Sequence, residues 1–318
     1  MKKNCLFSAP FSFFREEDFA KFEKIFNVQY EEIWSEDEIG DCNDIEVWIC
    51  NPGQNFTITD SVLSYFPKIK LIVTPSTGTN HINKDVCFSK GIKVLGLLDD
   101  KNDLQSIRAS SEFTFLLILN SLRRLDIALL EYKEKRWRDR EDELRGFELY
   151  GKKVGIVGLG RNGGNVARWC KEFGAQVSYF DPYVNSATFE KISIEGLFSA
   201  SDIICITCTL SDETKSMINL NLLNSLKKNA VLVNTSRGEV IDENDLASVL
   251  SNRDDLIISL DVLSGEVEDA QFNSPLYSYA QDGRLLVTPH ISGATIDSQL
   301  KAAHISFKLA KNNIYASK

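Results

Sequence analysis

The sequence has no apolar run long enough to cross a membrane, and it has no excess of basic residues. A membrane-spanning helix takes about 20 mostly apolar residues, so we expect no membrane partner. The net charge of −9 argues against a surface that binds nucleic acid. Low-complexity tracts and repeats are also lacking, and the hydrophobic content (43%) is that of a globular protein. The 318 residues suffice for two domains, each with its own core.

The seven cysteines lack the paired spacing of a metal site, and the nearest pair, Cys205 and Cys208, lies in an apolar stretch. A chain of this size does not need disulfides to hold its core. We therefore expect reduced and mostly buried thiols, no metal, and a cytoplasmic protein. The first residues resemble a signal peptide, but Pro10 and the charges from Arg15 onward interrupt the apolar run. A strand and a turn that lead into a helix are expected there instead.

Short apolar strands alternate with amphipathic segments along the chain, which predicts parallel sheets with helices on both faces. A polar connection (99–111) and a long apolar helix (112–130) separate two such regions. The expected strands are 47–50, 71–74, 91–95, 154–157, 176–180, 203–207, 230–234, 256–260 and 285–287, and the expected helices include 60–66, 219–226, 243–250 and 297–315.

The stretch 131–145 is dense in charges of both signs and contains Trp137. A solvated helix and loop explain this composition. The alternative is an arm that packs against a second subunit, which would bury the tryptophan.

Three glycines, Gly158, Gly160 and Gly163, follow the buried strand 154–157 at the spacing G-x-G-x-x-G and precede an amphipathic segment. Strand, glycine turn and helix are the context that a dinucleotide-binding fingerprint requires. The first glycine allows the tight turn, the second lets backbone N–H groups approach a pyrophosphate, and the third lets helix and strand pack closely. Asp181 ends the next strand, where a carboxylate can bind the adenosine ribose and repel a 2′-phosphate, so NAD is favoured over NADP.

The chain has only three histidines as candidate proton donors near neutral pH. His304 lies inside the last expected helix, where a structural role is favoured, and His81 follows a loop beyond strand 71–74. His290 stands at the carboxyl end of a strand, which is the edge where open α/β sheets bind ligands. Arg237 and Glu266 follow two neighbouring strands in the same way. Each alone is more often a surface residue, but together they predict a catalytic group.

The sequence resembles the D-isomer-specific 2-hydroxyacid dehydrogenases, the group that includes phosphoglycerate, glycerate and D-lactate dehydrogenases. The resemblance covers nearly the whole chain and is carried by the stretches 158–163, 179–183, 234–238, 261–263 and 288–291. It implies an α/β protein of two doubly wound parallel-sheet domains. A Rossmann-type NAD domain (106–290) would be inserted into a flavodoxin-like substrate domain (1–105 plus 291–318).

The resemblance implies hydride transfer between NAD and C2 of a small 2-hydroxy or 2-oxo acid. His290 would give a proton to the carbonyl oxygen, a contribution of typically about 10²–10⁴-fold. Glu266 would orient the imidazole and favour its charged form, and Arg237 would hold the substrate carboxylate. The implied cofactor contacts are Gly158, Gly160, Arg161, Asn162, Gly163, Asp181, Thr207, Thr235 and Asp261, and the implied substrate contacts are the backbone N–H groups of Thr77 and Gly78.

Three departures from the family pattern bear on specificity. Thr207 and Thr209 stand where the family often has His and Pro, and the usual G-x-D-x-I-D stretch reads 78–83 without either carboxylate. The connection 99–111 is longer than the usual turn and contains Lys101 and Arg108. We hypothesise that Arg108 contacts a second anionic group of the substrate, because the loops 51–55 and 75–80 have almost no basic residues; an arginine solvated in the connection is the alternative.

The sequence therefore predicts an NAD-dependent dehydrogenase that forms a homodimer through residues 112–145. Phosphoglycerate is a candidate substrate, although no regulatory domain is expected after the last helix. Two alternatives stay open. One is a non-catalytic NAD-sensing protein like the transcriptional corepressor of the same family, and the other is a formate or phosphite dehydrogenase of the same fold.

Overall fold

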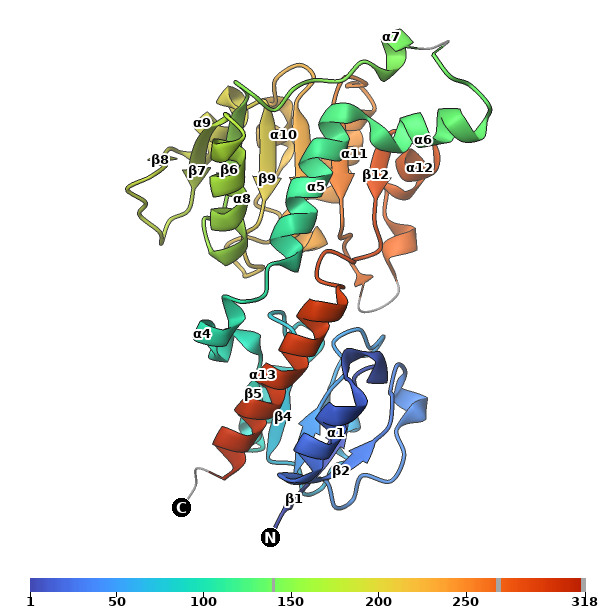
Figure 1. Ribbon diagram of the computed structural model, residues 1–318, viewed down its shortest axis with the longest axis vertical. Coiled ribbons are helices and arrows are strands. Elements are labelled where there is room, and N and C mark those ends of the chain that lie inside the picture. Colours follow the sequence, from blue (N-terminus) through green and yellow to red (C-terminus); the bar gives the residue numbers. More distant parts are fainter. Residues whose placement is uncertain (139–140, 267–269, 316–318) are drawn as a thin grey trace. The chain divides into compact units, whose positions relative to one another are not determined.

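The computed structural model describes residues 1–138, 141–266 and 270–315, which form two compact units (Figure 1). The first unit takes Met1–Ile107 and the chain from Ala294 onward, and the second takes Arg108–Glu266 and Ala270–Gly293. The division expected from the sequence lies after residues 105 and 290. Within the described ranges, none of the helices combines the length and the apolar character that crossing a membrane needs.

The described part of the first unit contains a parallel five-stranded sheet in the order β2-β1-β3-β4-β5. This is the strand order of flavodoxin-like folds, so the predicted fold of this unit is confirmed. Its strands are β1 (Lys3–Phe7), β2 (Phe26–Tyr30), β3 (Val47–Ile49), β4 (Leu71–Val73) and β5 (Lys93–Leu95). Its helices are α1 (Glu16–Glu23), α2 (Asp60–Leu63), α3 (Lys84–Ser89), α4 (Lys101–Leu104) and α13 (Ile296–Ile314), with 3-10 turns at Phe11–Phe13, Glu36–Glu38 and Leu97–Asp99.

Both faces of this sheet are buried, because successive side chains of a strand point to opposite faces. Ile49 of β3 packs in the cluster that includes residues of α1 and α13. Its neighbour Trp48 packs in the cluster of α2 and α3. Phe22 of α1 stacks on Phe307 of α13, with ring centroids 3.4 Å apart. The last helix of the chain therefore completes the core of the first unit.

The described part of the second unit contains a parallel seven-stranded sheet in the order β12-β11-β10-β9-β6-β7-β8. Counted from β6, this is the Rossmann order with one strand added at the end, so the predicted fold is confirmed here too. The strands are β6 (Lys153–Val157), β7 (Gln176–Phe180), β8 (Glu190–Lys191), β9 (Ile203–Ile206), β10 (Val231–Asn234), β11 (Ile257–Leu260) and β12 (Leu285–Val287). The helices are α5 (Ala109–Arg123), α6 (Leu125–Lys133), α7 (Glu141–Leu144), α8 (Arg161–Glu172), α9 (Ile194–Ala200), α10 (Leu220–Asn224), α11 (Glu243–Leu250) and α12 (Tyr277–Gln281), with 3-10 turns at Gly238–Val240 and Ala270–Asn273.

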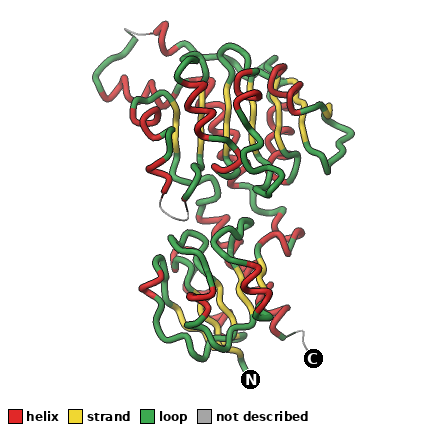
Figure 2. The backbone as a smooth tube through the Cα atoms, turned by 180° about the vertical axis from the view of Figure 1, so that it is seen from behind, coloured by secondary structure: helices red, strands yellow, loops and turns green. Residues whose placement is uncertain are grey.

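Helices cover both faces of this sheet. Figure 1 shows α5 and α8 in front of the strands, and Figure 2 shows the sheet from behind. The central strand β9 displays the alternation: Ile203 and Cys205 pack with α5 and α8. Ile204 and Ile206 pack with α9, α10 and α11. A strand that is buried on both faces is apolar at nearly every position. The short apolar runs in the sequence therefore predicted the central strands.

The expectation of one long helix at 112–130 is wrong. Helix α5 ends at Arg123 and α6 begins at Leu125, because Arg124 between them has a left-handed backbone with φ +50°. A left-handed residue interrupts the helical hydrogen bonds and redirects the chain. The connection 99–111 contains α4, and the helix expected at 60–66 ends at Leu63.

Candidate active site

The glycine turn after β6 has the shape that a dinucleotide requires. Gly158 has φ +88°, a conformation that side chains avoid, and a Cβ on it would lie 2.7 Å from the Cα of Cys208. A Cβ on Gly163 would lie 2.0 Å from the carbonyl oxygen of Gly158, so α8 packs directly against the turn. Nothing lies within 4 Å of a Cβ placed on Gly160. The helix N-terminus therefore has open space above its backbone, and this space fits a pyrophosphate.

Asp181 follows β7 directly and is fixed beside the glycine turn. Its Oδ2 accepts a hydrogen bond from the backbone N–H of Leu159 at 2.9 Å. Its Oδ1 accepts from the N–H groups of Tyr183 at 2.9 Å and Val184 at 3.0 Å. The carboxylate is thus held rigidly, at the place where the fold binds an adenosine ribose.

Thr207 supports the glycine turn from the neighbouring strand. Its Oγ1 lies 2.8 Å from the carbonyl oxygen of Gly158 and 3.1 Å from that of Val157. Arg161 begins α8, and burial lowers the pKa of its guanidinium. A half-buried cation at this helix N-terminus suits an anionic ligand.

Asn162 and Thr235, two more predicted cofactor residues, form hydrogen bonds with side chains of α5. The Oδ1 of Asn162 accepts a hydrogen bond from the hydroxyl of Ser111 at 3.1 Å. The hydroxyl of Thr235 lies 2.7 Å from that of Thr114 in a buried contact. These contacts hold both residues at the sheet edge, and their contact with the cofactor stays a prediction.

Asn234 shapes the turn that carries Arg237 at the end of β10. Its Nδ2 donates to the carbonyl of Arg237 at 3.0 Å, and its Oδ1 accepts from the N–H of Ser236 at 3.0 Å. The guanidinium of Arg237 donates to the carbonyl of Ser236 at 2.6 Å. Burial lowers the pKa of Arg237, whereas the charges of Glu266 and Glu239 raise it. The turn therefore presents a partly desolvated guanidinium with carboxylates close by.

His290 and Glu266 form the pair that the sequence predicts. The Nδ1 of His290 lies 2.5 Å from Oε2 of Glu266, and the other carboxylate oxygen accepts from the N–H of Leu263 at 2.9 Å. Because a carboxylate only accepts hydrogen bonds, Nδ1 carries the hydrogen of this contact. Nε2 is then the nitrogen that can exchange a proton with a substrate. The imidazole is 44% exposed, so a ligand can reach it.

Asp261 clamps the loop on which His290 lies. Its fully buried carboxylate accepts hydrogen bonds from the hydroxyl of Thr288 at 2.6 Å and from the N–H groups of Ile291 and Ser292, each at 2.9 Å. Its backbone carbonyl accepts from the N–H of His290 at 2.8 Å. His290 has φ +51°, a strained conformation that such contacts stabilise. Asp261 thus positions the histidine, and its contact with a nicotinamide stays a prediction.

Gly238 and Glu243, which the sequence does not single out, bring the loop after β11 close to the turn that carries Arg237. A Cβ on Gly238 would lie 2.0 Å from the carbonyl carbon of Leu263, so only a glycine permits this approach. The buried carboxylate of Glu243 accepts from the N–H of Ser264 at 2.6 Å. A glycine directly after an arginine at a strand end was the available signal for the first, whereas the role of Glu243 depends on a tertiary contact.

The predicted substrate contacts lie elsewhere in the chain. Thr77 and Gly78 belong to the first unit, in the loop after β4, where the hydroxyl of Ser76 donates to the carbonyl of Gly78 at 2.5 Å. Arg108 is exposed and directly precedes α5 at the start of the second unit. The roles of all three toward a substrate stay predictions.

The other two histidines have contacts that favour structural roles. His81 is buried, and its Nε2 lies 3.7 Å from the Sγ of Cys50. The Nε2 of His304 lies 3.1 Å from the carboxylate of Asp18, which links α13 to α1. All seven cysteines are free, and all but Cys208 are buried.

Comparison with known proteins identifies the family. Residues 115–292 match the model of the D-isomer specific 2-hydroxyacid dehydrogenase NAD binding domain, and residues 6–101 match that of the catalytic domain. The chain belongs to this family. Residues 115–292 form its NAD-binding domain, which confirms NAD as the predicted cofactor.

Similar proteins differ in activity. D-3-phosphoglycerate dehydrogenase of Mycobacterium tuberculosis is 30% identical over 77% of this chain, but the match spans only 45% of that relative. Glyoxylate reductase of Korarchaeum cryptofilum is 28% identical over 85% of this chain and 79% of its own length. The structure of D-lactate dehydrogenase from Aquifex aeolicus, complexed with NAD and lactic acid, matches 99% of this chain and 96% of its own, with TM-score 0.84 and 24% identity. The chain thus spans about half the length of the phosphoglycerate dehydrogenases it matches, and the last likeness shows the fold.

Proposed function

We propose that the protein is an NAD-dependent dehydrogenase that transfers a hydride between the nicotinamide and C2 of a small 2-hydroxy or 2-oxo acid. The observation that carries this proposal is the contact of 2.5 Å between His290 and Glu266. This pair and the half-buried Arg237 stand at the same edge of the parallel sheet as the glycine turn. A proton donor, a carboxylate that orients it and a cation are the groups that reduction of a 2-oxo acid needs.

Each residue contributes a separate step. Arg237 binds the substrate carboxylate through its planar fork and polarises the neighbouring carbonyl. NADH, when bound at the glycine turn, would supply the hydride, and the carbonyl oxygen that His290 faces would gain negative charge. Nε2 of His290 gives this oxygen a proton, while Glu266 keeps the ring oriented through Nδ1. In the direction of oxidation, the same nitrogen removes the proton of the hydroxyl.

A histidine pair within the chain supplies a matched test. His290 and His304 are both 44% exposed and both contact a carboxylate, but only His290 lies at the sheet edge. We expect His290→Asn to lower kcat for reduction of the best 2-oxo acid by about 10²–10⁴-fold with little change in NADH affinity. His304→Asn should retain the activity. Full turnover in the His290 variant would refute the assignment.

Oxidation of NADH with a panel of 2-oxo acids separates this proposal from the two alternatives. Tight NADH binding without turnover of any acid would favour the non-catalytic sensor. The formate or phosphite dehydrogenase would be favoured if formate or phosphite reduces NAD while no 2-oxo acid supports NADH oxidation. A cytoplasmic location agrees with the free cysteines, and it stays a prediction.

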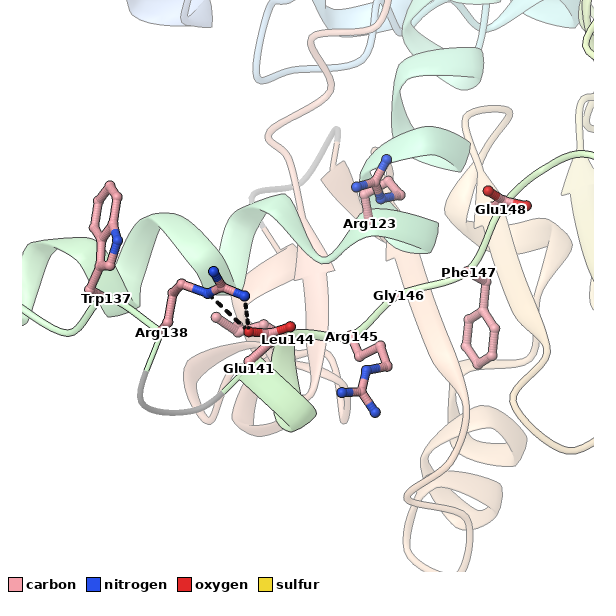
Figure 3. A pocket seen from close by; sticks show the side chains of 9 residues that line it. All are labelled: Arg123, Trp137, Arg138, Glu141, Leu144, Arg145, Gly146, Phe147 and Glu148. Atoms are coloured by element: carbon pink, nitrogen blue, oxygen red, sulfur yellow. Dashed lines mark hydrogen bonds and ion pairs between the residues drawn. The ribbon is translucent and has the colours of Figure 1, made fainter.

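We infer that the protein forms a homodimer through the region 112–145. Leu125, Leu129 and Tyr132 are exposed at spacings that place them on one face of α6. Trp137 beyond this helix is 74% exposed, and Figure 3 shows it pointing away from the paired Arg138 and Glu141. Trp137, Arg138 and Glu141 border a pocket of about 410 Å³. An exposed apolar stripe of this kind is typical of a surface that a second subunit covers.

A further inference from the structure

A hydrogen bond joins two loops on either side of the glycine turn. The hydroxyl of Tyr183 lies 2.5 Å from Oε2 of Glu213. Tyr183 follows β7 and Glu213 follows β9, and these strands are the two neighbours of β6 in the sheet. The bond therefore spans the end of β6 at the edge where the cofactor is bound. We call Tyr183 and Glu213 the tyrosine–glutamate clasp.

The clasp is connected to Asp181, the carboxylate that is predicted to bind the adenosine ribose. The N–H of Tyr183 donates to Oδ1 of Asp181, so the same residue contacts both acids. The hydrogen bond with Glu213 raises the pKa of the Tyr183 hydroxyl, and the charges of Glu213 and Asp181 raise it further. The carboxylates of Glu213 and Asp181 thus both act on the Tyr183 hydroxyl. Both carboxylates therefore lie at the same end of the predicted cofactor site.

Asp181 alone has limited capacity to discriminate between cofactors. Three backbone N–H groups already donate to its two oxygens. A carboxylate offers about four acceptor positions, and the three donors also neutralise part of its charge. A second carboxylate at this end strengthens the repulsion that a 2′-phosphate would meet.

Lys191, in strand β8, directs its ammonium at two backbone carbonyls and one side-chain oxygen of the loop after β7. The ammonium of Lys191 lies 3.1 Å from the carbonyl of Val184, 3.2 Å from Oδ1 of Asn185 and 3.5 Å from the carbonyl of Pro182. It holds the loop after β7 in place. A 2′-phosphate would have to compete with these three oxygens for it.

We propose that Glu213, held by Tyr183, is a second specificity-determining carboxylate that acts with Asp181 to exclude NADP. The role of Glu213 is electrostatic, and the role of Tyr183 is to position it. This inference rests on the NAD use of the proposed function and adds residues to it that the glycine fingerprint does not contain.

The test compares the dissociation constants of NADH and NADPH, measured by the change in nicotinamide fluorescence. We expect Glu213→Gln to strengthen NADPH binding by roughly two- to fivefold, as befits an exposed charge, with a smaller effect on NADH. Asp212→Asn is the matched control, because it removes the same charge from the adjacent exposed position. An unchanged NADPH to NADH ratio in Glu213→Gln, or an equal shift in Asp212→Asn, would overturn the proposal.

Two further readouts separate positioning from mere loop stability. Tyr183→Phe keeps the ring and releases Glu213, so it should reproduce part of the gain in NADPH binding. The double variant should then bind NADPH no better than Glu213→Gln alone, because the two residues act as a unit. The advantage of Glu213→Gln should also shrink at 1 M salt, where the screening length falls to about 3 Å. Additive effects or a salt-independent ratio would contradict the clasp.

Failure of this inference is distinguishable from failure of the proposed function. Binding of both dinucleotides can be measured without turnover, so an inactive protein still tests the clasp. If neither dinucleotide binds, both the clasp and the dehydrogenase assignment are wrong.

Discussion

Two adjacent glycines in the first turn of α8 should respond to alanine in opposite ways. A Cβ on Gly163 would lie 2.0 Å from the carbonyl oxygen of Gly158 and 2.5 Å from the hydroxyl of Thr207. The carbonyl would have to move by roughly 1 Å to reach a separation of 3.0 Å, below which real Cβ atoms are essentially never found. A Cβ on Gly164 would meet Arg168 at 3.7 Å, which is an ordinary contact.

The magnitudes follow from these distances. Overpacking against backbone costs about 1–3 kcal/mol, and Gly163→Ala should lie toward the upper end because a carbonyl of the tight turn has to move. Gly164→Ala should instead raise the free energy of unfolding by about 0.5–1 kcal/mol, since alanine is the better helix former. For a domain of about 150–250 residues, 1 kcal/mol shifts Tm by roughly 2–4 °C.

Thermal unfolding followed by circular dichroism and fluorescence titration with NADH would measure both effects. Gly163→Ala should unfold at a lower temperature and bind NADH at least about tenfold more weakly, because the displaced carbonyl belongs to the turn that approaches the pyrophosphate. Gly164→Ala should unfold slightly higher and bind NADH normally. Equal behaviour of the two variants would refute the contact between α8 and the turn.

Two further predictions concern pH and assembly. Hydrogen bonds from Arg253 hold the pKa of Asp255 well below its usual range. This ion pair therefore stabilises the second unit above about pH 4, the pKa of an aspartate in the unfolded chain. Its contribution to stability is lost as the pH falls toward the lowered pKa of the folded state. Urea unfolding at a series of pH values should show a shallower loss of stability below pH ~4 in Asp255→Asn than in the wild type, and a normal loss in Asp254→Asn. Leu129→Glu should convert the expected homodimer to a monomer, as measured by light scattering. The control Phe88→Glu changes an exposed apolar position of the first unit and should leave the mass unchanged. A dimeric Leu129 variant would exclude α6 from the interface.

The central strands, and the grouping of three candidate catalytic residues at one sheet edge, could be predicted because the same physical constraint acts along the sequence. Parallel strands covered on both faces must be continuously apolar, so β6 and β9 are visible as short runs. The residues after such strands necessarily share one edge of the sheet. This is why Arg237, Glu266 and His290 could be grouped before any distance was known.

Features that depend on local backbone or on distant partners could not be predicted in this way. Arg124 ends α5 in a left-handed conformation without a glycine or an asparagine to indicate it. The edge strand β2 alternates buried and exposed positions over only five residues, a pattern too short to separate from a loop. Gly238 and Glu243 act through contacts with residues 263 and 264, and their sequence neighbours do not reveal these partners.

The stacking of Phe22 on Phe307 has a consequence for how the chain is made. The first unit needs α13 for its core, yet about 190 residues, nearly all of them in the second unit, are synthesised between Ile107 and Ile296. Synthesis proceeds at about 5–20 residues per second. One apolar face of the first sheet is therefore uncovered for roughly 10–40 s before α13 is made, while the Rossmann unit can already fold. The cofactor domain can therefore complete its fold before the first unit does, and during that interval the uncovered aromatic side chains of the first unit are accessible to chaperones.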